Sequence, residues 1–298
     1  MSIDHEIRIT AFNWLTEQVS IHGDVLSWNV LSQGFIFKDQ RIPLVSPQGI
    51  FRPRLCRYPL TIRSAPDGPY DDKFSKGDVL LYRYRGDNYL HRDNIGLREA
   101  MKNSIPLIYL FGVVPGKYLA TWPVFVVGDD LKNLTFTVTV DDAAIIKEDE
   151  LVVKDSDEAR RAYITSMVKI RLHQRSFREK VIHAYRTQCA FCRLKHPELL
   201  DAAHIIPDNE PQSRPTIDNG LSLCKLHHAA FDSFILGVSP EYVIEVREDI
   251  LKEHDGPMLQ HGLKELHHQR IILPRKQEFW PNRDFVDWRY QKFRAVSI

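Results

Sequence analysis

Residues 189–232 read CAFCRLKHPELLDAAHIIPDNEPQSRPTIDNGLSLCKLHHAAFD, and this stretch decides how the last part of the chain folds. It holds two pairs of potential metal ligands, Cys189 with Cys192 and Cys224 with His227, and each pair is separated by two residues. Three thiolates and one imidazole make a tetrahedral zinc site with no position open for water. We therefore predict a structural Zn²⁺ that stabilises a module too small to fold on its own core. The alternative is a set of ordinary buried cysteines beside an unrelated histidine.

The same stretch predicts a β-loop-β-helix unit. Residues 199–207 are mostly apolar and end at a proline, which is typical of a strand. A loop rich in Pro, Asp, Asn and Ser leads to a second strand at residues 219–223, and residues 225–234 continue as a helix. On that helix His228 and Asp232 are four positions apart, so they lie on one face and can bind one ion.

A second set of polar residues in this unit suits phosphodiester hydrolysis. That reaction needs a base to activate water and a cation to stabilise the phosphate and the leaving oxygen. His204 has a pKa range suited to the base. His228 and Asp232 suit the cation, and Asn219 would fix the loop through its amide. A lone histidine is usually a satisfied core residue, but four such residues beside a zinc clamp indicate a catalytic centre.

Residues 177–236, with the motifs DAAHIIP and DNGLSLCKLHHAAFD, resemble the HNH family of ββα-metal nucleases. By that resemblance His204 is the general base and Asn219 organises the loop. His228 and Asp232 become ligands of a catalytic divalent cation, which would be Mg²⁺ or another ion such as Mn²⁺ or Ni²⁺.

The chain departs from the family's pattern directly before the base. Many family members carry a metal ligand there, whereas this chain has Ala203. Asp201 is two positions earlier and points to the same side of a strand as Ala203. We include Asp201 among the expected ligands of the divalent cation, acting directly or through a water. The alternative role of a surface acid stays open.

Composition and length allow two globular domains in a chain of 298 residues. No apolar stretch approaches the roughly 18 residues of a membrane span, and the acidic start MSIDHEIRIT is not a secretory signal. We therefore expect a cytoplasmic protein with no membrane partner. Four cysteines are few for a disulfide framework, and Cys56, which lies outside the metal pattern, is expected to be a reduced core residue.

The first half of the chain predicts a mostly β domain. Between Val25 and about Val140, short apolar runs are broken by Pro, Gly and Asp. The predicted strands are residues 35–37, 60–63, 79–84, 107–111, 122–127 and 134–140. An amphipathic helix capped by Asp4 precedes them, and one helix at about residues 93–103 interrupts them. This pattern favours a curved sheet or a partial barrel.

The fold class is therefore α+β, with a recognition domain at residues 1–145, a linker and basic helix at 146–188, and a nuclease domain with a C-terminal extension at 189–298. Between Arg160 and Lys195 ten basic residues stand against one acid, Glu179. This favours a phosphate-contacting surface over a solvated helix face. The candidate DNA contacts are Arg171, Arg175 and Arg178. The expected buried positions of the helix are Tyr163, Met167, Ile170, Phe177, Val181 and Tyr185.

Residues 45–130 resemble, in layout, the SRA (YDG) domain, which reads modified cytosine in DNA. The shared order is a Tyr-x-Asp motif, a strand ending in Tyr-Arg-Gly, a helix opened by Asn94, a strand, and a turn into KYLATWPVFVV. In that family an extruded base is held between aromatic rings, and an acid accepts its amino group. The matching base-binding residues are Tyr70, Asp72, Tyr82 and Tyr84. Packing of the tyrosines on a sheet face is the alternative.

Together these patterns predict a metal-dependent endonuclease that cuts double-stranded DNA carrying modified cytosine, which is a modification-dependent restriction enzyme. Two alternatives stay open. One is a zinc-stapled DNA-binding regulator with an inactive centre, and the other is an HNH nuclease without a modified-base preference. Whether the chain acts as a homodimer is open as well.

Overall fold

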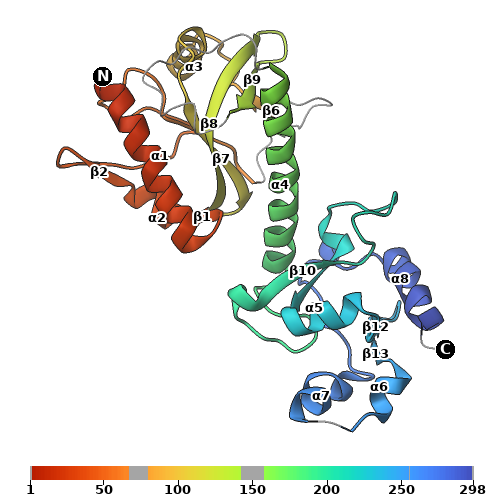
Figure 1. The fold of residues 1–298 in the computed structure, drawn as a ribbon. Coiled ribbons are helices and arrows are strands. Elements are labelled where there is room, and N and C mark those ends of the chain that lie inside the picture. The colour runs from red at the N-terminus through yellow and green to blue at the C-terminus, as the bar shows by residue number, and fades with distance from the viewer. Residues whose placement is uncertain (1, 67–79, 142–157, 255, 297–298) are drawn as a thin grey trace. The chain divides into compact units, whose positions relative to one another are not determined.

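The computed structural model describes residues 2–66, 80–141, 158–254 and 256–296 (Figure 1). The chain divides into two compact units, Met1–Arg175 and Ser176–Ile298, and the division falls inside helix α4 (Glu158–Ala184). Each unit has its own hydrophobic core and mixes helices with strands, as the α+β prediction expected. None of the described helices is long and apolar enough to cross a membrane.

A seven-stranded sheet forms the centre of the first unit (Figure 1). In order of pairing its strands are β4 (Ile50–Phe51), β5 (Thr61–Arg63), β7 (Leu107–Val114), β8 (Lys117–Asp130), β9 (Thr135–Val140) and β6 (Leu80–Arg83), and β1 (Val25–Ser27) also pairs with β8. The pairs are antiparallel except for β5 with β7, which is parallel. Strands β7 and β8 are buried along most of their length, as continuous apolar runs in central strands require. The curved sheet predicted from the sequence is confirmed as a curled half-barrel.

Three helices and a hairpin accompany this sheet in the first unit. They are α1 (Ile3–His22), α2 (Trp28–Gln33), the hairpin of β2 (Phe35–Phe37) with β3 (Gln40–Ile42), and α3 (Arg92–Lys102). Helix α1 buries Ile7 and Leu15 in one core cluster together with Leu26 and Ile108. The six predicted strands are present, but β1, β3, β4 and α2 were not predicted. They have two to six residues each, which is too short for a hydrophobic period to show.

Two predicted helix starts are wrong. Ser2, not Asp4, caps α1, because its hydroxyl accepts the His5 N–H at 3.3 Å. The Asp4 carboxylate instead accepts from Arg8 Nε at 2.6 Å, which is the charge-assisted geometry of a buried pair. The helix predicted at about residues 93–103 is present as α3, but it begins at Arg92 behind the cap His91, and Asn94 is its third residue.

The second unit contains the predicted β-loop-β-helix order. Strand β10 (Leu200–His204) pairs antiparallel with β11 (Gly220–Cys224), and α5 (Lys225–Asp232) follows directly. The elements after them are the hairpin of β12 (Leu236–Val238) with β13 (Ile244–Val246), then α6 (Glu248–Lys252), α7 (Pro257–Gly262) and α8 (Arg283–Val296). Single 3-10 turns lie at Pro197–Leu199, Ile217–Asn219, Lys264–Leu266 and Gln277–Phe279.

The predicted basic helix is present as α4, with one error in its buried face. Phe177, Val181 and Tyr185 are buried as predicted, whereas the side chain of Met167 is 50% exposed. The buried stripe of the helix in the first unit runs instead through Ile164, Val168 and Leu172, which recur every four residues. The side chains of Tyr163 and Ile170 lie outside the described residues, as does the acidic segment 142–157.

Candidate functional site

Three cysteines and one histidine converge in the second unit. Cys189 and Cys192 lie in the turn after α4, Cys224 ends β11, and His227 is in the first turn of α5. Their ligand atoms all lie within 4.8 Å of one another. Cys189 Sγ and Cys224 Sγ are each 3.3 Å from His227 Nδ1. The predicted zinc ligands therefore form one group with the donor set of a structural zinc site.

A contact behind His227 supports the fit to a metal. His227 Nε2 lies 2.7 Å from the carbonyl oxygen of Gly262, at the end of α7. A carbonyl only accepts, so Nε2 carries the proton and the Nδ1 lone pair faces the three sulfurs. Cys56 takes no part in the group: it is a buried free thiol, and burial raises its pKa to about 12. That pKa agrees with the prediction of an inert core cysteine.

The paired strands hold the loop that precedes Asn219. His204 pairs with Gly220 at the end of the β10–β11 ladder. The Asn219 side chain is fully buried; its Oδ1 accepts the Ile206 N–H at 2.8 Å, and its Nδ2 donates to the carbonyls of Ile206 and Arg214 at 3.1 and 3.0 Å. Through these hydrogen bonds the Asn219 amide links Ile206 at the start of the loop to Arg214 within it.

His204 stacks on an aromatic ring. The ring centroids of His204 and Phe177 are 3.9 Å apart with an interplanar angle of 14°. Burial lowers the pKa of His204, and the nearby charge of His228 adds to this, against the opposing effects of Asp208 and Asp232. Since its pKa lies below the ordinary value, the imidazole is neutral near pH 7 and is able to accept a proton.

His228 lies between two carboxylates. Its Nε2 is 3.2 Å from Asp232 Oδ2, and its Nδ1 is 3.7 Å from Asp201 Oδ2. The hydrogen bond to Asp232 raises the pKa of His228. Burial alone would raise the pKa of Asp232, but the hydrogen bonds and charges of His228 and Arg289 hold it below its usual value.

The structure thus brings the three expected cation ligands together, but around different nitrogens. The two ring nitrogens of an imidazole point apart, so one ion can contact only one of them. An ion at Nε2 would be shared by His228 and Asp232, while Asp201 faces the opposite nitrogen. Within the described part of the chain, the cysteine–histidine group is the one cluster of three or more such side chains whose ligand atoms converge.

The three arginines predicted to contact DNA each have a partner within the chain. Arg171 and Arg175 both contact Asp24, at 2.7 and 3.2 Å, and about half of each side chain stays exposed. Arg178 donates to the Leu200 carbonyl at 2.6 Å and lies 3.4 Å from Asp201 Oδ1. Arg178 is therefore part of the structure around Asp201, which the charge pattern alone did not indicate.

Three residues at the centre were missed from the sequence. Phe177 was predicted as a buried helix residue, but its role as the platform for His204 was not. Gly262 and Arg289 belong to the C-terminal extension, and each contacts a motif residue more than 30 positions away. No local signal marks such contacts, because they depend on how the extension packs.

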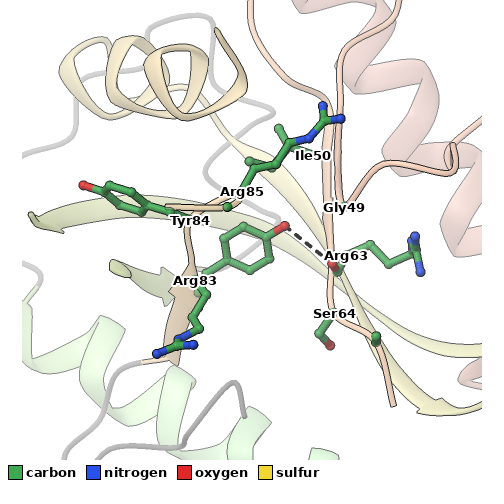
Figure 2. A pocket seen from close by; sticks show the side chains of 10 residues that line it. Gly49, Ile50, Arg63, Ser64, Arg83, Tyr84 and Arg85 are labelled. Atoms are coloured by element: carbon green, nitrogen blue, oxygen red, sulfur yellow. Dashed lines mark hydrogen bonds between the residues drawn. The ribbon is translucent and has the colours of Figure 1, made fainter. Parts of the chain in front are cut away.

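The base-binding residues proposed for the first unit can be followed only in part. Tyr70 and Asp72 lie outside the described residues. Tyr82 and Tyr84 line a pocket of about 240 Å³ (Figure 2). Arg63 and Ser64, at the end of β5, form one side of it, and residues at the end of β6 form the other.

This pocket lies where the two ends of the strand order approach each other. Strands β4 and β6 are at opposite ends of the sheet, yet both line the pocket. The Tyr82 hydroxyl donates to the Arg63 carbonyl across it at 3.5 Å. The space is narrow at Gly49, where an added Cβ would lie 3.1 Å from the Tyr82 hydroxyl and 3.2 Å from that carbonyl.

Several contacts hold the side chain of Tyr84. Its hydroxyl donates to Asp129 and accepts from Arg98 at 2.9 Å, and the Arg98 guanidinium lies 5.2 Å from the centroid of its ring. Its ring also packs on Phe136 at 4.5 Å. This is the sheet-packing role that was the alternative for the tyrosines, and Tyr82 packs in the same core, edge-on to Tyr109 with 6.2 Å between the ring centroids.

Residues 189–239 match the family model described as HNH endonuclease. The second unit of this chain therefore contains an HNH endonuclease domain, and the matched range includes the cysteine–histidine group, His204, Asn219, His228 and Asp232.

Two solved structures are similar to the chain, both at 14% identity. One is the "Modification dependent TagI restriction endonuclease", with a TM-score of 0.29, covering 79% of this chain and 81% of that one. The other is the "Type IV phosphorothioation-dependent restriction endonuclease ScoMcrA", with a TM-score of 0.22, where the match covers 80% of this chain and 50% of that protein. No curated protein matches the sequence.

Proposed function

We propose that this protein is a metal-dependent endonuclease that hydrolyses phosphodiester bonds of double-stranded DNA. The observation that carries the proposal is the placement of the neutral His204 imidazole on Phe177, within electrostatic reach of the His228–Asp232 pair, inside a segment that matches the HNH endonuclease family. The convergent cysteine–histidine group beside them supports a structural Zn²⁺ there.

Each residue has a task in this reaction. His204 accepts the proton of the attacking water; its lowered pKa keeps the imidazole unprotonated near neutral pH, so that it is available for this task. Asn219 holds the loop after His204 through its amide. His228 and Asp232 hold a divalent cation, which when bound supplies charge to stabilise the phosphate and the leaving oxygen.

The contact geometry favours an orienting role for Asp201 rather than a ligand role. A histidine that binds a metal through one nitrogen generally donates its other N–H to a carboxylate, and this fixes both its tautomer and its ring orientation. Asp201 Oδ2 lies beside Nδ1 of His228, on the side opposite Asp232. Asp201, at an ion-pair distance of 3.7 Å, would therefore orient the His228 ring through its Nδ1 side, and Nε2 is left for the cation.

The first unit is the reader of the substrate, with a function like that of an SRA domain. Its pocket has aromatic and arginine walls and suits a planar heterocycle, such as a modified cytosine extruded from the duplex. Contacts of an HNH centre are mainly to backbone phosphates and carry little sequence information. A separate base pocket would supply the missing selectivity and make the enzyme a modification-dependent restriction endonuclease.

Parallel digests test both parts of this function. The protein is incubated with Mg²⁺, Mn²⁺ or Ni²⁺ and two plasmids of one sequence, one with modified and one with unmodified cytosine. Cutting of the modified plasmid alone is expected. Equal cutting of both plasmids would support the proposed nuclease activity and contradict the proposed preference for modified cytosine.

A second candidate function has one observation in its favour. The side chains of Asp201, His228 and Asp232 do not converge on a single point, and Ala203 replaces a usual ligand. A DNA-binding regulator with a silent centre would fit that arrangement. Such a regulator would shift DNA in a gel but would not nick it in the presence of Mg²⁺, Mn²⁺ or Ni²⁺.

A further inference from the structure

The two aspartates beside His228 are held in the same way. Each turns its Oδ2 to a ring nitrogen of His228, Asp201 at 3.7 Å and Asp232 at 3.2 Å. Each gives its Oδ1 to an arginine: Arg178 Nε lies 3.4 Å from Asp201, and Arg289 Nη2 lies 3.1 Å from Asp232. One oxygen of each carboxylate is therefore restrained, and the other is directed to the centre.

Arg289 is the more unusual of the two arginines. It lies on α8, outside the segment that matches the HNH family, and its side chain is only 6% exposed. Its guanidinium also donates to the carbonyls of Ile205 at 3.3 Å and Phe231 at 2.9 Å, and it lies 4.0 Å from the centroid of the Phe231 ring. Buried and occupied in this way, it cannot reach a substrate phosphate.

The three acceptors connect the two halves of the centre. Ile205 directly follows His204 at the end of β10, and Phe231 and Asp232 end α5. A guanidinium is planar and presents its donors in a fixed geometry. One rigid group therefore sets the position of the strand that carries the proposed base relative to the helix that carries the proposed ligand.

Packing of α8 against the rest of the unit does not by itself explain why position 289 is an arginine. Arg289 Nε is buried and has no hydrogen-bond partner among the described residues. An unsatisfied buried donor lowers the stability of the fold, because it has lost its hydrogen bond to water. An apolar side chain of similar volume would pack α8 in place without leaving a donor unsatisfied. Buried ion pairs are often replaced by hydrophobic residues without loss of stability.

We propose that Arg289 is a positioning residue of the nuclease centre. It fixes Asp232 by one oxygen so that the other stays beside His228, at a defined place relative to His204, for a divalent cation. This inference rests on the proposed function. It assigns to the C-terminal extension a part in the centre that lies beyond the family's segment.

Electrostatics and positioning predict opposite effects when Arg289 is replaced. Arg289 carries a positive charge close to a cation site, so its removal would by charge alone strengthen cation binding. If Arg289 acts through the orientation of Asp232, its removal weakens cation binding instead. Orienting partners of metal ligands typically contribute about 10- to 100-fold in affinity or activity.

The test compares Arg289→Met with Val286→Ala in the full-length, zinc-loaded protein. Val286 is a buried residue of the same helix, and Val286→Ala loosens the packing of α8 while Arg289 and Asp232 are both kept. Mn²⁺ affinity is measured by electron paramagnetic resonance, and His228→Ala identifies the site. We expect Arg289→Met to bind Mn²⁺ about 10- to 100-fold more weakly than the parent. Val286→Ala is expected to keep the parent affinity.

Parent-like or tighter Mn²⁺ binding by Arg289→Met would overturn the proposal, as would an equal loss in Val286→Ala. If the Met variant does not fold, Arg289→Lys replaces it, since it keeps the charge but not the planar donors, and the same weakening is expected. A parent that binds Mn²⁺ through His228 yet cuts no DNA would refute the proposed function and leave the Arg289 comparison valid. If the parent protein does not bind Mn²⁺, both the proposed function and the proposed role of Arg289 are contradicted.

Discussion

At the scale of single residues, the centre depends on the different environments of two histidines. His204 is buried against Phe177, and its pKa is lowered; His228 is paired with Asp232, and its pKa is raised. His204 is therefore the less readily protonated of the two imidazoles in the metal-free protein. In the proposed reaction His204 would accept a proton, and His228 would give up its proton to bind a cation.

The first prediction concerns the base. His204→Ala should lower the cleavage rate by about 10²- to 10⁴-fold, which is the usual contribution of a positioned base. DNA affinity and the melting temperature should stay near the parent values, because the side chain is only partly buried. Rates are measured in single-turnover digests and affinity by gel shift. Cutting at the parent rate would show that another group is the base.

The second prediction is the order of titration. In the zinc-loaded protein without other divalent cations, His204 should titrate below 6.5 and His228 above it, since burial lowers the first pKa and the Asp232 contact raises the second. Acidification below 6.5 then costs stability through His204. The stability contributed by His228 is present at low pH and is lost as pH rises through its raised pKa. Two-dimensional NMR of the imidazole ring protons measures both pKa values as a function of pH. A higher pKa for His204 than for His228 would contradict the proposed roles of the two histidines.

The third prediction concerns Gly49 in the pocket of the first unit. A Cβ at this position would press on the Tyr82 hydroxyl at 3.1 Å and the Arg63 carbonyl at 3.2 Å. Gly49→Ala should therefore weaken binding to modified DNA while leaving its affinity for unmodified DNA unchanged. Gly256→Ala is the control, since nothing lies within 4 Å of its Cβ position. Fluorescence anisotropy with matched duplexes would measure both, and an unchanged preference would exclude this pocket as the base site.

At the scale of elements, α4 and β11 pack too closely for any side chain at Gly220. An added Cβ would lie 2.5 Å from Val181 Cγ2 and 3.0 Å from Phe177 Cζ. The same contact places Phe177 under His204, which pairs with Gly220 across the ladder. The glycine of the Asn219-Gly220 pair is thus required by helix–strand packing.

A fourth prediction follows from that packing. Gly220→Ala should destabilise the protein by about 1–3 kcal/mol, the usual cost of overpacking a core. It should also slow cleavage, because Phe177 has to shift. Urea unfolding measures the first effect and digestion the second. Stability equal to that of the parent would mean that α4 moves away from β11 without cost.

The elements also show how far the sequence could be interpreted. The strands and helix of the second unit were predicted to within a few residues, because their ends coincide with a proline, a loop-forming run and metal ligands. The cap of α1 and the buried face of α4 were wrong. Ser2 and Asp4 are both good capping residues, and the register of α4 depends on which side of the helix meets the first unit's core.

At the scale of the whole molecule, the two units have separate cores and separate requirements. The first unit is held by a seven-stranded sheet with continuous apolar strands. In the second unit, the cysteine–histidine group lies at the ends of two short paired strands and one short helix, β10, β11 and α5. A structural metal site of this kind contributes folding free energy directly to its own unit.

The fifth prediction is that chelation acts on one unit. Removal of zinc with a strong chelator, or Cys189→Ser, should abolish hydrogen-exchange protection in β10, β11 and α5. Protection in β7 and β8 should persist, because their core contains no metal ligand. Mass spectrometry of exchanged peptides from the full chain would show this, with zinc content measured alongside. Loss of protection in both sheets would contradict it.

The sequence by itself determined the cysteine–histidine group and the β-loop-β-helix order, and it supplied the proposed set of His204, Asn219, His228 and Asp232. All of these lie within one short stretch, where spacing and helical or strand period decide which side chains face one another. Only the tertiary structure decided that Asp201 and Asp232 face opposite nitrogens of His228, and that Arg289 from α8 holds Asp232. It also decided that distant strands enclose the pocket at Tyr82. These contacts join residues far apart in the chain, and their geometry is set by packing of whole elements, which no local pattern encodes.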